Sequence, residues 1–289
     1  MASNADILEN KSVVITGATS GIGLATAVTF AINGAFVIGI GRSESRISAA
    51  KAIIQKVNPR HEVIFLQADL AQQKQVQDLG VNIINALGEH QFDYLDVLIN
   101  NAGIYLEKKE MTIDGIEKTF AVNHLAPFLL THLLLPYLER AQQGRVLTVS
   151  SYSHRTTPLN LRRIANPWPY IGLVAYKRSK LCNVLFSYEF NRCNNKVEAF
   201  AVDPGLVNTE IALKGDPGIS EWVWRKRRHK GTSADVPVKT LLFLSSNAHI
   251  DTSNGYFFRD SQAIEPSRNA KRLDLAKALW TLSMKLTGI

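Results

Sequence analysis

The chain has 289 residues, of which 46 % are hydrophobic and 20 % are charged, and its net charge is +8. This balance suits a globular protein with a sizeable core. The two cysteines, Cys182 and Cys193, form neither a metal-binding cluster nor a disulfide framework, which predicts no metal site and a reducing, intracellular location such as the cytoplasm. The N-terminus lacks the pattern of a signal peptide. Prolines and polar residues interrupt the apolar segment 120–138, so we expect a buried helix there and no transmembrane span.

Apolar runs and helical periodicity alternate along the chain. The apolar runs predict strands at 12–17, 36–41, 62–70, 95–103, 145–151, 197–205 and 255–260. The periodicity predicts helices at 21–35, 44–58 and 71–89, two helical stretches within 112–142, a helix around 175–186 and a tail helix near 266–286. Because the strands are continuously apolar, both faces of the sheet should be covered. We therefore predict one α/β domain over residues 1–289, a doubly wound, seven-stranded, mostly parallel sheet with helices on both faces.

The first predicted strand runs into the glycine-rich stretch "TGATSGIG", residues 16–23, which opens a helix. Glycines allow a tight turn and a close approach to a pyrophosphate, and a helix N-terminus favours that anion. The spacing differs from the commoner Gly-x-Gly-x-x-Gly, and a tight turn without a ligand is the alternative. Its position in the first strand–helix unit nevertheless predicts a dinucleotide site. The residues expected to contact the dinucleotide are Gly17, Thr19, Ser20, Gly21, Ile22 and Gly23.

The second predicted strand ends in "GIGRSESR", where an acidic residue would normally bind a ribose 2′-hydroxyl. Gly41 occupies the expected acid position and Arg42 follows it. A carboxylate there would repel a 2′-phosphate, whereas an arginine offers that phosphate a charge-assisted partner. Arg42, assisted by Ser43 and Arg46, therefore predicts NADP(H) in preference to NAD(H). The alternative is that Arg42 is an ordinary surface arginine.

Tyr176 and Lys180 lie four residues apart in "AYKRSKLCNVLF", so they should share one face of a helix. A lysine beside a tyrosine favours the phenolate and makes the phenol a usable proton donor. Alone, the pair is equally compatible with an ordinary helix. The fifth strand ends at Ser150 and Ser151, at the sheet edge where doubly wound proteins bind ligands. His154 follows closely, but no Gly-x-Ser-x-Gly elbow accompanies it, which argues against a Ser-His hydrolase.

Together these features resemble the short-chain dehydrogenase/reductase family and its Rossmann fold. The matching motifs follow the family order: the glycine loop, "ADL" with Asp69, "NNAG" at 100–103, Asn123, "SS" at 150–151, the Tyr176–Lys180 pair and "DPGLVNT" at 203–209. The surroundings of the pair are most similar to the retinol-dehydrogenase-like branch, which includes the oxidoreductase domain of WW-domain oxidoreductases. That branch has a similarly long segment between the serine and the tyrosine, and the family pattern selects Ser151 over Ser150.

The resemblance implies an NADP(H)-dependent oxidoreductase acting on a carbonyl or alcohol. Tyr176 would exchange a proton with the substrate oxygen, and Ser151 would orient that oxygen. Lys180 would lower the pKa of Tyr176 and hold the nicotinamide ribose, while Asn123 would position a water in a proton relay. A non-catalytic NADP-binding scaffold or sensor is the alternative. The other cofactor contacts implied are Asp69, Leu70, Asn100, Ala102, Gly103, Pro204, Gly205, Val207 and Thr209, with a helix N-cap as a second role for Asp69.

Substrate specificity in this fold usually resides in loops at the carboxyl ends of the strands. We expect substrate loops at 152–173 and 211–233, the second forming an apolar lid, and hence a lipophilic substrate such as a retinoid, a steroid or a fatty aldehyde or ketone. The segment 222–230 joins two tryptophans to "RKRRHK". Three interpretations are open for this segment: a solvated basic face, a peripheral membrane contact or a nucleic-acid site. No recognised nucleic-acid motif accompanies it, so we expect no nucleic acid as partner. The oligomeric state is left open, with a homodimer as one option.

Overall fold

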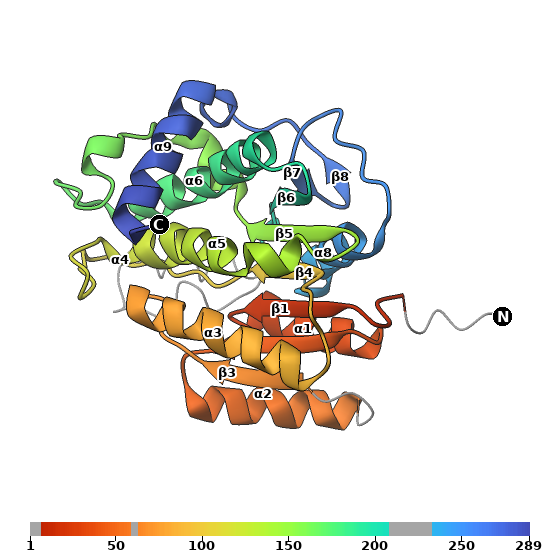
Figure 1. Cartoon of the computed structure of the whole chain (residues 1–289). Helices are drawn as coiled ribbons and strands as arrows, with labels where there is room; N and C mark the ends of the chain where they lie inside the picture. Colours follow the sequence, from red (N-terminus) through yellow and green to blue (C-terminus); the bar gives the residue numbers. More distant parts are fainter. Residues whose placement is uncertain (1–6, 59–62, 208–232) are drawn as a thin grey trace.

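The computed structural model describes residues 7–58, 63–207 and 233–289 (Figure 1). Its elements in chain order are β1 Ser12–Thr16, α1 Gly21–Ile32, β2 Phe36–Gly41, α2 Glu44–Val57, β3 Val63–Gln67, α3 Gln73–Glu89, β4 Val97–Asn100, α4 Lys118–Phe120, η1 Ala121–Leu125, α5 Ala126–Leu138, β5 Gly144–Val149, η2 Tyr152–Thr156, η3 Leu161–Arg163, α6 Gly172–Cys193, β6 Val197–Val202, α8 Asp235–Ser246, β7 Phe257–Arg259, β8 Gln262–Ala263, η5 Asn269–Lys271 and α9 Leu273–Thr287. Thr209, the segment 222–230 and nearly all of the expected loop 211–233 lie outside the described residues.

The strands form one sheet in the order β3-β2-β1-β4-β5-β6-β7-β8. Every neighbouring pair is parallel except β7 and β8, which confirms the doubly wound Rossmann-like prediction. The eighth strand was not predicted. It pairs with β7 across a two-residue turn in which Asp260 and Ser261 both have positive φ, 50° and 60°. Such turns usually carry Asn-Gly or Asp-Gly, and the Asp-Ser pair found here is a weak signal for a hairpin.

Helices cover both faces of the sheet (Figure 1). The apolar side chains of α1, α2 and α8 pack in one core against β1, β2 and β4. Those of α3, α5 and α6 pack in a second core on the opposite face. Helix α8 was not among the predicted helices. Helix α6 carries Tyr176 and Lys180, and it lies between the sheet and the C-terminal helix.

The segment Lys118–Leu138 is one continuous helical run, where two helical stretches were expected. Its middle, η1, is a π-helix of five residues that carries Asn123, and such insertions occur frequently at functional sites. By length and composition the run would suffice to cross a membrane, but 72 % of its most apolar window is buried inside the protein. It therefore has the burial expected of a core helix.

Helix α9 packs over the outer side of α5 and α6 (Figure 1). The Trp280 ring stacks on Phe186 with centroids 5.9 Å apart and meets Phe128 edge-on at 5.1 Å. The helix begins at Leu273, later than predicted, because Asn269–Lys271 forms a separate 3-10 turn. It ends at Gly288, whose φ of 72° gives a left-handed C-cap.

Replacing Trp280 tests whether α9 is an integral part of the core. We expect Trp280→Ala to lower the free energy of unfolding by about 3 kcal/mol, because it removes a packed aromatic side chain. Leu273→Ala is the matched control, since Leu273 lies on the same helix and is 60 % exposed; its effect should stay within about 0.5 kcal/mol. Urea unfolding followed by circular dichroism measures both. Equal effects would show that α9 does not depend on Trp280.

Candidate active site

The glycine loop between β1 and α1 closes tightly against the end of β4. Gly17 and Gly21 have positive φ, 69° and 54°. A Cβ on Gly23 would lie 2.2 Å from the Gly17 oxygen and 2.4 Å from Nδ2 of Asn101. That Nδ2 donates to the Thr16 carbonyl at 2.9 Å, which fixes the loop on the sheet. The turn therefore depends on glycine, as a close approach to a dinucleotide requires.

The first turn of α1 faces a cleft of about 400 Å³ at the carboxyl ends of β1 to β4. No side chain caps this helix at Ser20, so its first N–H groups are available to an anion. The cleft lies at the point where the strand order reverses between β1 and β4, the usual ligand position in such sheets. The predicted cofactor residues that line it are Gly17, Thr19, Ser20, Arg42, Ser43, Arg46, Asp69, Leu70, Ala102 and Gly103.

Other lining residues were missed by sequence reasoning. They are Ile40, Gly41, Ala68, Ile104, Lys118 and Val122. Ile40, Gly41 and Ala68 lie within the quoted stretches "GIGRSESR" and "ADL", where only their neighbours were expected to contact the cofactor, and Ile104 directly follows "NNAG". Lys118 and Val122 come from the helical run after β4 and reach the cleft only through the tertiary fold, so no local motif marks them.

Several predicted contacts do not line the cleft in the part of the chain that the structure describes. Asn100 turns into the core, where Nδ2 donates to Oγ1 of Thr131 at 3.3 Å. Gly21, Ile22 and Gly23 shape the loop without lining the cavity, and Pro204, Gly205 and Val207 lie beyond its lining. Asp69 does line it while its Oδ1 accepts the Ala71 N–H at 3.1 Å. The expected helix N-cap role of Asp69 is wrong, because α3 begins at Gln73 and Gln72 is its N-cap; the bond to Ala71 closes a local turn before the helix.

The end of the cleft near β2 is closed to an acidic side chain at position 41. A Cβ on Gly41 would lie 2.5 Å from Cγ2 of Thr19 and 2.8 Å from Cγ1 of Ile47. Arg42 and Arg46 are exposed beside it and line the same cleft. This end therefore presents cationic groups and excludes the carboxylate that would repel a phosphate.

Tyr176 and Lys180 lie on one face of α6, as expected, and both are buried. Nζ of Lys180 is 5.6 Å from the Tyr176 ring centroid and donates to the Val149 carbonyl at 2.9 Å. Burial lowers the pKa of Lys180 to about 8. Burial also raises the pKa of Tyr176 to about 12, and the Asp203 carboxylate adds to that rise. The pKa of Tyr176 is thus raised where a lowering was expected, because loss of hydration of the phenolate dominates.

The two adjacent serines at the end of β5 have different partners. Ser150 is buried, and its Oγ donates to the Lys180 carbonyl at 2.7 Å. Oγ of Ser151 accepts the Ser153 N–H at 3.2 Å, so the Ser151 hydroxyl can still donate its own proton. The hydrogen bond from Ser151 counteracts the rise in the pKa of Tyr176. This arrangement favours Ser151 as the residue that shares a substrate oxygen with the phenol.

Asn123 is fully buried, and its side chain joins two segments of the chain by hydrogen bonds. Its Oδ1 accepts the Ile104 N–H at 2.8 Å, while Nδ2 donates to the Ile104 carbonyl at 3.0 Å and to Oγ of Ser179 at 2.9 Å. These bonds hold the loop after β4 against the helix that carries Tyr176. Both amide donors are engaged, and the water-positioning role of Asn123 stays a prediction.

His154 is buried and has two backbone partners. Its Nε2 accepts the Ser267 N–H at 3.1 Å, so Nδ1 carries the proton and donates to the Ser151 carbonyl at 2.8 Å. Burial lowers the pKa of the imidazole, which keeps it neutral. Both ring nitrogens are occupied, so His154 is not arranged as a base for the Ser151 hydroxyl.

Known proteins are similar to this chain in sequence. Residues 11–217 match the short chain dehydrogenase family model. The chain is 30 % identical to retinol dehydrogenase 11 of Mus musculus, over 98 % of this chain and 88 % of the relative. It is 33 % identical to WW domain-containing oxidoreductase of Gallus gallus, over 96 % and 68 % respectively.

Two solved structures show the same architecture. An uncharacterised protein from Mycobacterium paratuberculosis is 31 % identical, with a TM-score of 0.74 over 99 % of this chain and 96 % of the other. A short chain dehydrogenase from Escherichia coli complexed with NADPH is 22 % identical, with a TM-score of 0.66 over 88 % and 98 %. With the geometry above, these matches assign the chain to the short-chain dehydrogenase/reductase family of oxidoreductases, in its retinol-dehydrogenase-like branch.

Proposed function

We propose that the protein is an NADP(H)-dependent oxidoreductase that interconverts a lipophilic carbonyl compound and its alcohol. The observation that supports NADP(H) over NAD(H) is the end of the cleft at β2. Gly41 leaves no room for an acidic side chain there, and Arg42 offers a guanidinium for a 2′-phosphate. The family supplies the reaction class, and the E. coli neighbour binds NADPH in the same fold.

The residues around the end of β5 would each have a separate role in reduction of the carbonyl. Bound nicotinamide would supply the hydride. The Ser151 hydroxyl, whose hydrogen bond lowers the pKa of Tyr176 in this structure, would donate to the substrate oxygen and polarise it. Tyr176, with a pKa of about 12, is fully protonated at neutral pH and can donate its proton to that oxygen. The Lys180 ammonium then stabilises the phenolate that is left behind.

The substrate class rests on the relatives and on apolar side chains near the phenol. Tyr105 meets the Tyr176 ring edge-on at 6.0 Å, which gives the phenol an aromatic neighbour. A retinoid, a steroid or a fatty aldehyde or ketone is the substrate class that we propose, with 152–173 and 211–233 as substrate loops. An intracellular location with peripheral membrane contact through 222–230, and a homodimeric state, belong to the same proposal. A non-catalytic NADP-binding scaffold is the alternative.

Tyr176→Phe separates the enzyme from the scaffold. It should lower kcat for NADPH-dependent reduction of retinal by about 10²-fold or more, because the general acid is lost, and leave the Kd for NADPH within about threefold of wild type. Tyr137→Phe, on α5, is the control and should behave as wild type. Loss of NADPH absorbance measures turnover, and NADPH fluorescence measures binding. NADPH binding without turnover of retinal, steroid ketones or fatty aldehydes by the wild type would favour the scaffold.

The pH dependence should follow Lys180. Its lowered pKa means that it carries a charge below about pH 8 and loses it above. The kcat/KM for NADPH, which reports groups of the free enzyme, should therefore fall as the pH rises through about 8, while the phenol stays protonated. Lys180→Arg keeps its charge at every accessible pH, so any remaining activity should lack this fall. A flat wild-type profile up to about pH 10 would contradict the assignment.

Arg42→Ala tests the cofactor preference. Removing a charge-assisted hydrogen bond to a phosphate costs about 1.5–3 kcal/mol, so the ratio of kcat/KM for NADPH to that for NADH should fall by about tenfold or more. Lys51→Ala removes the same charge from the exposed side of α2 and should leave the ratio unchanged. Steady-state kinetics with both cofactors provide the measurement. An unchanged ratio in Arg42→Ala would show that Arg42 does not select the cofactor.

A further inference from the structure

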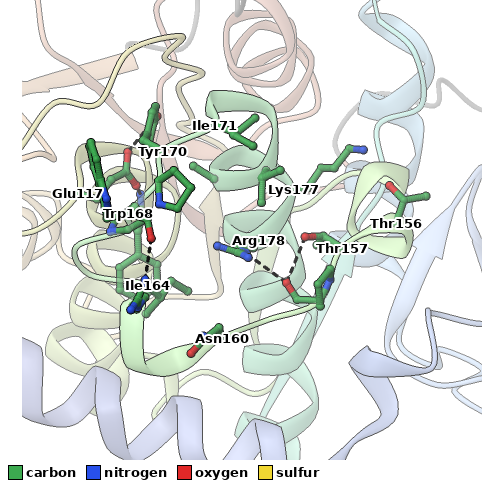
Figure 2. Close-up of a pocket in the computed structure, with 17 residues that line it drawn as sticks. Glu117, Thr156, Thr157, Asn160, Ile164, Trp168, Tyr170, Ile171, Lys177 and Arg178 are labelled. Carbon is green, nitrogen blue, oxygen red and sulfur yellow. Dashed lines mark hydrogen bonds between the residues drawn. The ribbon is translucent and has the colours of Figure 1, made fainter.

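A second cavity, of about 440 Å³, lies between the segment 156–171 and helix α6 (Figure 2). Val174, Ala175 and Arg178 of α6 line it. Residues of an α-helix follow one another at about 100° around its axis, which places these three almost opposite Tyr176 and Lys180. The helix itself therefore separates this cavity from the catalytic groups, and it is a different site from the cofactor cleft.

The walls of the cavity are mainly apolar. Its volume falls within the range of about 300–1,000 Å³ that is usual for small-molecule sites. The indole of Trp168 is 74 % exposed, between two prolines that also line the cavity. An indole held in this way offers a rigid apolar surface to a ligand. The apolar lining residues are Phe120, Pro158, Ile164, Pro167, Trp168, Pro169, Ile171, Val174 and Ala175.

Three cationic side chains line the cavity: Arg163, Lys177 and Arg178. Figure 2 shows Arg178 pointing into the space between α6 and the segment, whereas the side chain of Lys177, which also lines the cavity, extends outward. Nη1 of Arg163 donates to the Trp168 carbonyl at 2.8 Å. Nε of Arg178 donates to the Pro158 carbonyl at 3.1 Å, which fixes the group in place. Its two terminal nitrogens form a planar pair that matches a carboxylate.

The acidic residue in the lining, Glu117, does not compete for that guanidinium in this structure. Its carboxylate accepts the Thr119 and Phe120 N–H groups at 2.9 and 2.8 Å, and the Tyr170 hydroxyl at 3.3 Å. It is thereby committed to the start of α4 and to the end of the segment 156–171. The cavity thus combines apolar walls with cationic side chains, and the terminal nitrogens of Arg178 can still donate to a ligand.

We infer that this cavity binds an amphipathic monocarboxylate, with an aliphatic or isoprenoid chain against the apolar walls and the carboxylate on Arg178. The planar guanidinium of Arg178 suits a carboxylate, and the apolar lining requires a hydrocarbon body. This inference does not rest on the proposed substrate. The ligand would contact the helix that carries Tyr176 and Lys180, on the face away from them.

Calorimetric titration of the full chain with dodecanoate, in the presence of saturating NADPH, tests the site. Dodecanoate should bind with a stoichiometry of one and at least about tenfold more tightly than dodecanol, because only the carboxylate pairs with the guanidinium. Binding should also change the tryptophan fluorescence, and Trp168→Phe should remove most of that change. Equal affinity for the acid and the alcohol would overturn the inference.

Two matched pairs of variants locate the ligand. Arg178→Gln should weaken dodecanoate binding by about tenfold, whereas Lys51→Gln, which removes the same charge from an exposed position on α2 outside the lining, should change it by less than about twofold. Val174→Trp should fill the cavity and abolish binding, whereas Leu173→Trp, at a position 44 % exposed and outside the lining, should not.

Retained NADPH binding shows that each variant is folded. Equal effects of Arg178→Gln and Lys51→Gln would overturn the inference, even if Val174→Trp failed to fold. Dodecanoate binding that survives Val174→Trp and competes with the carbonyl substrate would place the ligand in the catalytic cleft and would likewise overturn it.

Discussion

The buried ammonium group of Lys180 is the constraint on which the active site depends. It donates to a backbone carbonyl, that of Val149, and the carbonyl of Lys180 in turn accepts the Ser150 hydroxyl. Two hydrogen bonds between the end of β5 and α6 therefore meet at one residue. Burying a charge on a neutral acceptor costs several kcal/mol, and the lowered pKa of Lys180 is a measure of that cost. Such an arrangement favours a functional role over a purely structural one.

The position of Lys180 determines the surroundings of Tyr176 and Ser151. Because α6 is held against β5 at this point, the phenol one turn earlier lies beside the strand end, next to Ser151. Asn123 fixes the third side of the site by joining the loop after β4 to Ser179 of the same helix. The catalytic groups are thus held by bonds between rigid elements, and little reorganisation is needed when charge develops on a substrate oxygen.

Local patterns in the sequence predicted most of the fold and the cofactor loop, since strand hydrophobicity and glycine spacing are properties of neighbouring residues. They did not predict the features that depend on tertiary contacts. In "NNAG", either amide could have faced the cofactor; Asn100 turns into the core to Thr131, and Asn101 holds the glycine loop. Lys118 reaches the cleft only because the helical run after β4 folds back over it. The pKa of Tyr176 was misjudged because burial cannot be read from the spacing of two residues.

The long segment between Ser151 and Tyr176 has a consequence that the sequence did not show. It bends around the start of α6 and leaves a cavity on the far face of that helix. Protein interiors are normally close-packed, and each unfilled contact forfeits dispersion energy. An insertion that served only to cover α6 would gain stability by collapsing onto it. Here the backbone carbonyl of Pro158 accepts a hydrogen bond from Arg178, and prolines flank an exposed Trp168. These features hold the segment apart from the helix. That rigidity is expected of a wall built to receive a ligand.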